Sequence, residues 1–142
     1  MLVAEILKAK GGAVHSVAPK DSVADAARTL DARKIGALVV CDGDRCVGVL
    51  SERDIVRAIA RDGADALSRP VSVYMTRKVI FADPRESTAE LMTRMTDRRI
   101  RHLPILREDR LVGVISIGDV VKVQIEESAR EAESLKSYIA AG

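Results

Sequence analysis

Aromatic residues are scarce in this chain, whose 142 residues include two Tyr, one Phe and no Trp. Proteins that bind single-stranded nucleic acids stack the bases on aromatic side chains. The chain has almost no side chains for such stacking, and this disfavours a nucleic-acid partner. Hydrophobic residues nevertheless make up 47% of the sequence and charged residues 31%, which is the composition of a globular protein with an aliphatic core.

The sequence also lacks a surplus of charge and a long hydrophobic segment. Its 23 Lys and Arg residues against 21 Asp and Glu residues give a net charge of +2, so any anion site must be local. The longest apolar runs, 35–41 and 111–117, are far shorter than the ~20 residues of a membrane span. Residues 1–12 contain Glu5 and no small-residue cleavage pattern, so we predict no secretory signal, no membrane partner and a cytoplasmic location.

Cysteine and histidine are rare as well. Cys41 and Cys46 flank a short polar loop, which places them opposite each other on a predicted hairpin. They are either a redox pair or small buried side chains, and a reducing compartment favours the second interpretation. His15 and His102 are the only histidines and have no spaced Cys or His partners, so we expect no metal site.

The most informative feature of the sequence is an internal repeat. A shift of 65 positions aligns residues 14–60 with 79–125 without a gap, and 15 of the 47 aligned positions are identical. In each copy a short extended stretch (14–17 or 79–81) leads to a Ser-capped helix, a hairpin of two apolar runs and a second helix. The order β-α-β-β-α therefore occurs twice, and we predict an α/β (α+β) fold of two copies packed around a pseudo-twofold axis.

This repeat divides the chain into five segments. The connecting and terminal segments carry no copy of the repeat. The predicted division is an N-terminal helix and lead-in at 1–13, a first repeat at 14–62, a connecting segment at 63–75, a second repeat at 76–125 and a C-terminal helical extension at 126–142.

Each copy contains the pattern G-h-h-S-x-x-D, at residues 48–54 and 113–119, where the last hairpin strand meets the second helix. A Ser followed three residues later by an acid is a common helix cap, so the pattern can be purely structural. Alternatively, the helix amino terminus can attract a phosphate while the Asp carboxylate accepts the two hydrogen bonds of a ribose diol. The residues by themselves leave both interpretations open.

The two β-α-β-β-α copies, their G-h-h-S-x-x-D ends and the sequence R-H-L-P at 101–104 together resemble a tandem pair of cystathionine-β-synthase (CBS) domains. The resemblance covers residues 14–125. It implies that clefts between the copies bind an adenosine-containing regulatory ligand, namely AMP, ATP, NAD(H) or S-adenosylmethionine, with no required cofactor.

The resemblance also implies roles for individual residues. It assigns ribose binding to Ser51, Asp54, Ser116 and Asp119. It assigns phosphate binding to Arg53, Arg101 and His102. It assigns the adenine pocket to Val14, Val17, Ile35, Ala37, Val79, Phe81 and Pro104.

The two copies differ at these positions, so we expect two sites of unequal affinity. Gly118 stands where the first copy has Arg53, and Gly36 and Ala37 stand where the second has Arg101 and His102. Hairpin geometry places Arg101 and His102 beside the second G-h-h-S-x-x-D pattern, although a contribution across the pseudo-twofold axis is also open.

No catalytic motif is present: the sequence lacks GxSxG, Walker A and HExxH patterns, and neither Ser of the repeated pattern has a fixed His partner. We therefore predict a sensor of adenine nucleotides that is not an enzyme. The resemblance further implies a homodimer, and we expect an unidentified protein partner that receives the signal. The alternative function is a ligand-free interaction scaffold.

Beyond residue 123 no helix breaker occurs before Gly142, which predicts a long extension of the last helix. Its apolar and small residues recur at spacings of three and four. These residues are Ile125, Ala129, Ala132, Leu135 and Ile139. The stripe either folds back on its own domain together with residues 1–10 or packs against another subunit.

Overall fold

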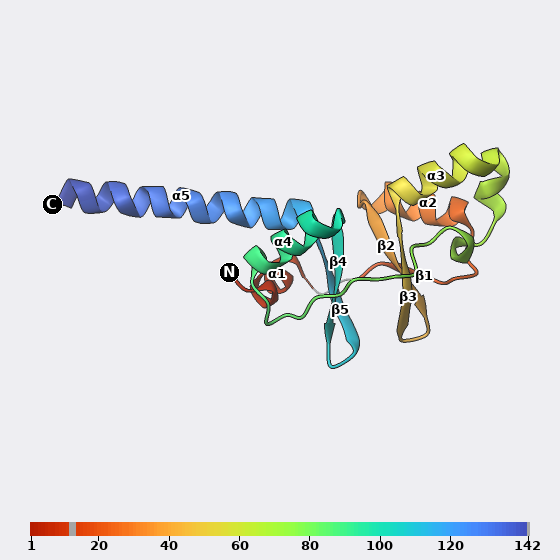
Figure 1. Cartoon of the computed structure of the whole chain (residues 1–142), viewed down its shortest axis with the longest axis horizontal. Helices are drawn as coiled ribbons and strands as arrows, with labels where there is room; N and C mark the ends of the chain where they lie inside the picture. The colour runs from red at the N-terminus through yellow and green to blue at the C-terminus, as the bar shows by residue number, and fades with distance from the viewer. Residues whose placement is uncertain (12–13, 142) are drawn as a thin grey trace.

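The computed structural model describes residues 1–11 and 14–141 (Figure 1). The segment boundary predicted at residue 13 and the chain end at residue 142 lie outside these residues. No helix in the described part is long and apolar enough to cross a membrane. The elements in chain order are α1 (Val3–Lys10), β1 (Ser16–Val17), α2 (Val23–Arg33), β2 (Ala37–Asp42), β3 (Arg45–Ser51), α3 (Glu52–Asp62), the 3-10 helices η1 (Gly63–Ser68) and η2 (Val71–Val73), α4 (Thr88–Arg98), β4 (His102–Arg107), β5 (Arg110–Ser116) and α5 (Ile117–Ala141).

The predicted helix starts are confirmed and have the same local cause in both repeats. The Ser22 side chain accepts a hydrogen bond from the Asp25 backbone N–H at 3.1 Å, and Ser87 does the same for Glu90. Each cap satisfies one of the backbone donors that a helix leaves free at its amino end. These caps fix where α2 and α4 begin, and both helices end at a residue of left-handed conformation, Lys34 or Arg99, before the next strand.

The hairpins β2–β3 and β4–β5 have the predicted antiparallel register. Cys41 lies opposite Cys46, as expected, and both are free thiols. Burial raises the pKa of both cysteines, so neither thiol is activated. At the tip of the second hairpin Glu108 and Asp109 both have positive φ, 50° and 64°, as a tight two-residue turn requires.

The two sheets differ in their first strand. In the first repeat β1 pairs in parallel with β2 and completes a three-stranded sheet, whereas the second sheet has only β4 and β5. The stretch 79–81 forms no strand, and the first strand predicted for this repeat is reduced to one parallel bridge between Ala82 and Ile105, the equivalent of the Val17–Val40 pair. The reason is that the preceding chain is still paired with the first sheet, where Thr76 bridges Val49, and it reaches the second sheet only at Ala82.

The segment from Thr76 to Ala82, called the crossing segment below, therefore connects the two sheets. The Thr76 and Val49 backbones exchange hydrogen bonds of 2.9 and 3.0 Å, and the Ala82 N–H donates to Pro104 O at 3.0 Å. Figure 1 shows this segment running across both hairpins. It brings residues at the start of the second repeat over the end of β3 in the first.

Helix α1 and η2 hold equivalent places at the two repeats. The Val3 N–H donates to Glu86 O in one repeat, and the Val71 N–H donates to Asp21 O in the other. Both valines are fully buried. Val3 and Val71 are 71 − 3 = 68 positions apart, whereas the aligned residues of the two repeats are 65 apart. The structural repeat therefore includes α1 and η2, which lie before the residues that the ungapped sequence alignment covers.

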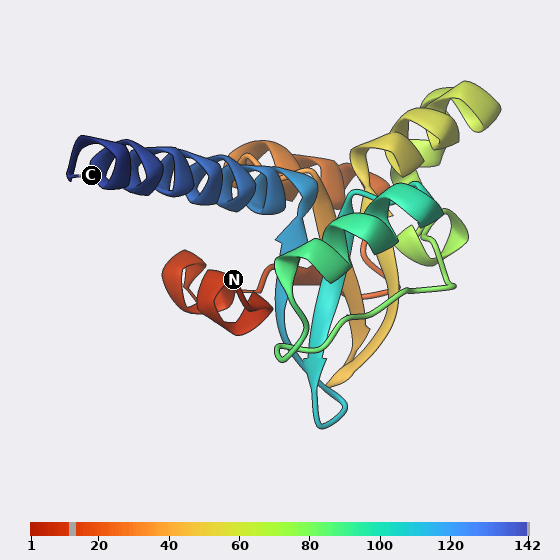
Figure 2. The same cartoon turned by 60° about the vertical axis from the view of Figure 1, so that its left-hand side comes forward.

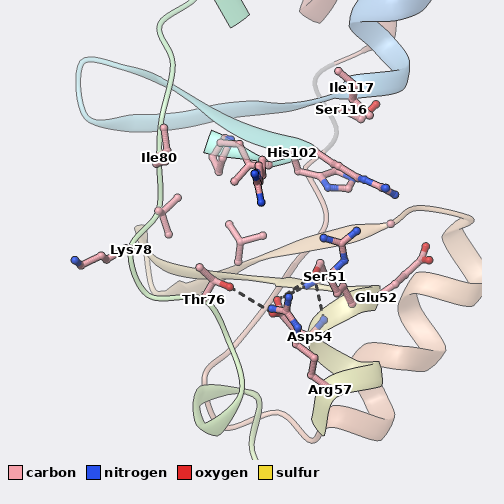
Figure 3. A pocket seen from close by; sticks show the side chains of 18 of the residues that line it. Ser51, Glu52, Asp54, Arg57, Thr76, Lys78, Ile80, His102, Ser116 and Ile117 are labelled. Carbon is pink, nitrogen blue, oxygen red and sulfur yellow. Dashed lines mark hydrogen bonds between the residues drawn. The ribbon is translucent and has the colours of Figure 1, made fainter. Parts of the chain in front are cut away.

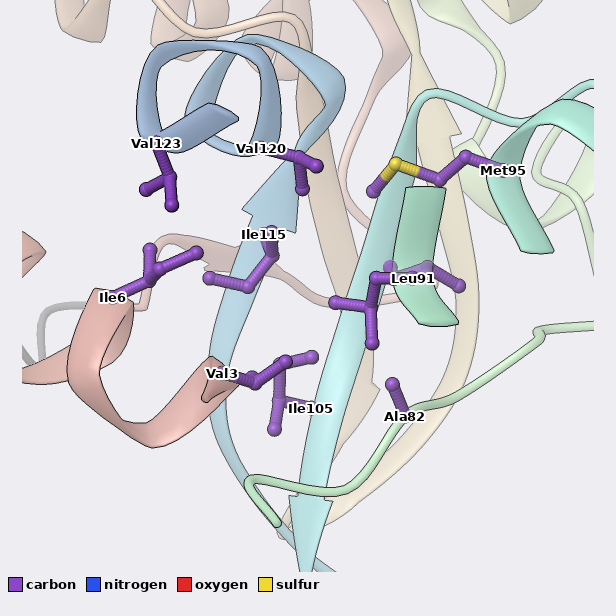
Figure 4. Packing of buried hydrophobic residues seen from close by; sticks show 10 residues of the cluster. Val3, Ile6, Ala82, Leu91, Met95, Ile105, Ile115, Val120 and Val123 are labelled. Atoms are coloured by element: carbon purple, nitrogen blue, oxygen red, sulfur yellow. The ribbon is translucent and has the colours of Figure 1, made fainter. Parts of the chain in front are cut away.

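Each repeat has its own aliphatic core. In the second, α1 and the first turns of α5 lie against β4, β5 and α4, as Figure 4 shows. The buried residues of this core are Val3, Ile6, Ala82, Leu91, Met95, Leu103, Ile105, Ile115, Val120 and Val123. The first core contains Val17, Val23, Ala26, Leu30, Leu38, Val40, Leu50, Ile55, Val71 and Met75.

Helix α5 is continuous for 25 residues, which confirms the predicted extension. Only its beginning packs on the domain: Val120 and Val123 are buried, whereas Ile125 and Leu135 have exposed fractions of 64% and 60%. The Met1 amino group forms an ion pair with Glu127 at 3.0 Å. Of the two alternatives for the stripe, folding back on its own domain is therefore wrong, because the helix leaves the core after Val123 and projects away from it (Figures 1 and 2).

Candidate functional site

A cavity of about 780 Å³ lies between the two repeats. Its walls are the beginning of α3, the crossing segment, the beginning of β4 and the beginning of α5 (Figure 3). Its apolar lining consists of Val49, Val56, Val79, Ile80, Ile100, Pro104 and Ile117. The volume is within the range that holds a nucleotide-sized ligand.

Asp54 is the carboxylate of this cavity. It is only 9% exposed, and its Oδ2 atom accepts hydrogen bonds from the Ser51 backbone N–H at 2.9 Å and the Ser51 hydroxyl at 3.1 Å. Thr76 donates to the other oxygen, Oδ1, at 3.4 Å. Oδ1 thus has only one long hydrogen bond, which leaves it acceptor capacity for a ligand.

The crossing segment supplies one wall of the cavity and brings the second repeat to Asp54. Thr76, Lys78, Val79 and Ile80 all line it, and Pro104 of β4 lies on the same side. The Asp of the first repeat is thereby combined with the lead-in of the second. Arg101 and His102 of the second repeat line the same cavity as Asp54, so the contribution across the pseudo-twofold axis that the sequence left open for these two residues is present.

Positive charge is concentrated around the cavity. It is lined by five cationic side chains and by His102, against the carboxylates of Glu52 and Asp54. The cations are Arg53, Arg57, Lys78, Arg99 and Arg101. A chain of nearly neutral overall charge therefore has a local site suited to an anion.

His102 lies where the two repeats meet. Its register partner is Ser116, as predicted, and a Cβ atom on Gly36 would lie 3.2 Å from its Nε2 atom, so glycine leaves room for the ring. Burial lowers the pKa of His102, as do the positive charges of Lys10 and Arg101, while the carboxylates of Asp119 and Glu52 act against them. The imidazole is neutral at neutral pH in the folded chain.

This environment predicts a pH dependence of stability. The pKa of His102 is lower in the folded chain than in the unfolded one, so the unfolded chain takes up a proton first as the pH falls below about 6.5. The free energy of unfolding should therefore decrease between pH 7 and 5, and His102→Gln should flatten this decrease in denaturant titrations. If His15→Gln flattens it and His102→Gln does not, this assignment is wrong.

The second carboxylate of the repeated pattern, Asp119, is differently placed. Its Oδ2 atom accepts hydrogen bonds from Lys10 Nζ at 2.7 Å and the Ser116 N–H at 2.8 Å. Burial by itself raises the pKa of Asp119, but the hydrogen bonds from Lys10 and Ser116 outweigh it and hold that pKa below its ordinary value. Lys10 also donates to Val114 O at 2.9 Å, so α1 covers this end of β5.

The structure brings together part of the predicted site. Eight of the predicted residues line the cavity: Ser51, Arg53, Asp54, Val79, Arg101, His102, Pro104 and Ser116. The others lie outside this lining: Val14, Val17, Ile35, Ala37, Phe81 and Asp119. Val17 belongs to the first core, Ile35 packs against that core, and Phe81 lines a separate shallow hollow beside the second hairpin.

The sequence analysis missed several lining residues. Thr76, Lys78 and Ile80 belong to the crossing segment, whose path over Asp54 depends on long-range pairing with Val49. Arg57 lies on α3 one helical turn after Arg53, and that spacing was the available signal. Among the described residues, no three His, Cys, Asp or Glu side chains gather where they could hold a metal ion.

The cavity combines three features that suit a phosphorylated nucleoside. These are a buried carboxylate with free acceptor capacity, an apolar wall and a group of cations. A carboxylate can accept hydrogen bonds from the two hydroxyls of a ribose, and arginines pair with phosphate oxygens.

Comparison with known proteins agrees with this arrangement. The family model of the CBS domain matches residues 4–61 and 71–126. The chain is 45% identical to a CBS-domain-containing protein, ATU1752, from Agrobacterium tumefaciens, whose crystal structure it matches with a TM-score of 0.85 over 87% of this chain and 99% of that one. It is 32% identical to CBSX3, a mitochondrial CBS domain-containing protein of Arabidopsis thaliana, over 99% of this chain and 72% of the relative.

A second similar structure carries a ligand. The CBS domain protein PAE2072 from Pyrobaculum aerophilum, described as complexed with AMP, is 26% identical and matches with a TM-score of 0.75 over 84% of this chain and 89% of that one. CBS-domain pairs are generally regulatory and non-catalytic modules. With a CBS model matching each repeat, the chain belongs to the CBS domain family and is a tandem pair of CBS domains.

Proposed function

We propose that this CBS pair is a regulatory module that binds a phosphorylated adenosine ligand, such as AMP, ATP or NAD(H), in the cavity between its repeats. The observation that carries the proposal is the position of Asp54, a buried carboxylate facing a cavity rimmed by cations. The AMP complex of the similar Pyrobaculum protein supports the adenosine class. The five lining cations favour a ligand with phosphates over S-adenosylmethionine, whose sulfonium is positive.

In this proposal each wall of the cavity has one role. Asp54 accepts hydrogen bonds from the ribose hydroxyls, and Thr76 beside it helps to orient the carboxylate. The adenine lies against Val79, Ile80 and Pro104. The phosphates lie among Arg53, Arg57, Arg101 and His102, near the amino end of α5 where Ser116 and Gly118 also line the cavity.

Asp119 does not take an equivalent role in this proposal, because Lys10 already neutralises it. We therefore propose one ligand per chain, in place of two sites of unequal affinity. The ligand contacts both repeats and so favours one arrangement of them over others. That difference in affinity between arrangements makes it a signal, which a homodimer of the chain passes to a protein partner.

Calorimetric titration of the purified full chain with AMP, ATP, NADH and S-adenosylmethionine tests the proposal. We expect saturable binding of a phosphorylated ligand at one molecule per chain, and weaker binding of S-adenosylmethionine. The protein must first be shown by mass spectrometry to be free of a co-purified nucleotide. No heat with any of the four ligands would favour the ligand-free scaffold instead.

A further inference from the structure

Besides the face that is buried on the domain, helix α5 carries an exposed apolar stripe, which includes most of the stripe identified in the sequence. Val121, Ile125, Leu135 and Ile139 have exposed fractions of 43%, 64%, 60% and 68%. With the exposed small residues Ser128 and Ala132 they follow the alternating spacing of three and four that defines the core positions of a coiled coil. The residues that pack on the domain, Val120 and Val123, belong to a different face of the helix.

Most of the stripe lies on the part of α5 that projects beyond the domain. After Val123 the helix continues for 18 residues, 124–141, and none of them is buried. An isolated helix of this length is marginally stable in water and takes most of its stability from an apolar face that is packed. Figures 1 and 2 both show this part of α5 extending beyond the rest of the chain, where another molecule can reach it.

We propose that a second copy of this chain covers the stripe, and that the two α5 helices form a parallel two-stranded coiled coil. The inference deepens the proposed homodimer by naming its contact, and it does not depend on the ligand. In this register Ile125, Ala132 and Ile139 occupy the a positions, and Val121, Ser128 and Leu135 occupy the d positions. In parallel coiled coils, β-branched residues at a with Leu at d favour two strands over three or four, and Ile139 with Leu135 provides that combination.

The charges flanking the stripe decide the orientation. Glu131 occupies a g position and Lys136 the e position five residues later, so a parallel pair places each Glu131 beside Lys136 of the other copy. In an antiparallel pair that matches Ile125 with Leu135, Glu131 faces its own counterpart and Lys122 faces Lys136. Only the parallel arrangement sets opposite charges together.

The mass of the full chain in solution tests the contact. Sedimentation equilibrium should give the mass of two chains for the wild type, whereas Leu135→Asp should weaken association at least about ten-fold, because it buries two carboxylates in the seam. Ser137→Asp, on the exposed outer face, should remain dimeric. Chemical denaturation verifies that both variants still unfold cooperatively, so that their domains are folded. A monomeric wild type, or a dimer that Leu135→Asp leaves intact, would overturn the proposal.

Disulfide cross-linking tests the orientation. In a chain with Cys41→Ser and Cys46→Ser, the additional change Leu135→Cys should give a cross-linked dimer under mild oxidation, because residues at d face each other in a parallel pair. Ser137→Cys should not. If Leu135→Cys links only to a chain carrying Ile125→Cys, the helices are antiparallel. Nucleotide titration of Leu135→Asp should match the wild type, which separates failure of this contact from failure of the proposed ligand site.

Discussion

Replacing Asp54 by alanine is expected to lower the affinity for AMP about 10- to 100-fold. A hydrogen bond to a charged group contributes about 1.5–3 kcal/mol, and each 1.4 kcal/mol is a factor of ten in affinity. The Asp54 carboxylate is the buried acceptor of the cavity, so its removal leaves the ribose hydroxyls without their charged partner. Calorimetric titration of the folded variant measures the change.

The matched control is Asp119→Ala, the same substitution at the equivalent position of the second repeat. Both aspartates accept a hydrogen bond from the backbone N–H of the Ser three residues earlier, at 2.9 and 2.8 Å. Both variants lose this helix-capping bond, so the free energy of unfolding should fall by ~0.5–2 kcal/mol in each. Only the Asp54 variant should lose AMP affinity. The opposite result, with Asp119 required and Asp54 dispensable, would place the ligand in the cleft that Lys10 now covers.

The local structure of the chain could be predicted because short-range chemistry determines it. The Ser-x-x-acid patterns at Ser22 and Ser87 fixed the helix starts, and the pairing of Cys41 with Cys46 followed from the short loop between them. His102 opposite Ser116 followed from hairpin geometry in the same way. In each case the residues that determine the structure are separated by 14 positions or fewer.

The composition of the site could not be predicted, because the pairing between repeats determines it. The sequence analysis assigned residues of both lead-ins to the adenine pocket without showing which Asp each lead-in would meet. The backbone pairing of Thr76 with Val49 instead carries Val79 and Ile80 to Asp54. The contact between Lys10 and Asp119 could not be predicted for a related reason. Helix α1 is the structural equivalent of η2, but the two are related by a shift of 68 positions, so the ungapped alignment at 65 does not reveal that α1 packs on a repeat.

The position of the cavity between the repeats means that one ligand can stabilise both of them. The two aliphatic cores share no residue, and the cavity takes Asp54 from the first repeat and Pro104 from the second. A ligand there contacts groups supported by both cores. Binding should therefore stabilise both repeats, since a ligand that binds only the native state shifts unfolding by mass action.

Two variants, each with one core leucine shortened to alanine, test whether the ligand stabilises both repeats. Leu38 and Leu103 are equivalent in the 65-residue shift and have exposed fractions of 1% and 0%. Leu38→Ala and Leu103→Ala should each lower the free energy of unfolding by about 2–5 kcal/mol, from lost burial and the cavity left behind. Chemical denaturation measures the loss, and Val73→Ala, at a side chain 57% exposed, should stay within about 0.5 kcal/mol of the wild type.

The same variants show whether the ligand supports both repeats. AMP is added to each variant at a hundred times the dissociation constant measured for that variant. It should raise the free energy of unfolding by about 2.7 kcal/mol in the Leu38→Ala chain and by an equal amount in the Leu103→Ala chain. The gain is equal because the site takes Asp54 from α3 of the first repeat and Pro104 from β4 of the second, so unfolding of either repeat destroys the site. If AMP stabilised only one of the two variants, the ligand would be held by a single repeat, and its binding could not set the arrangement of the pair.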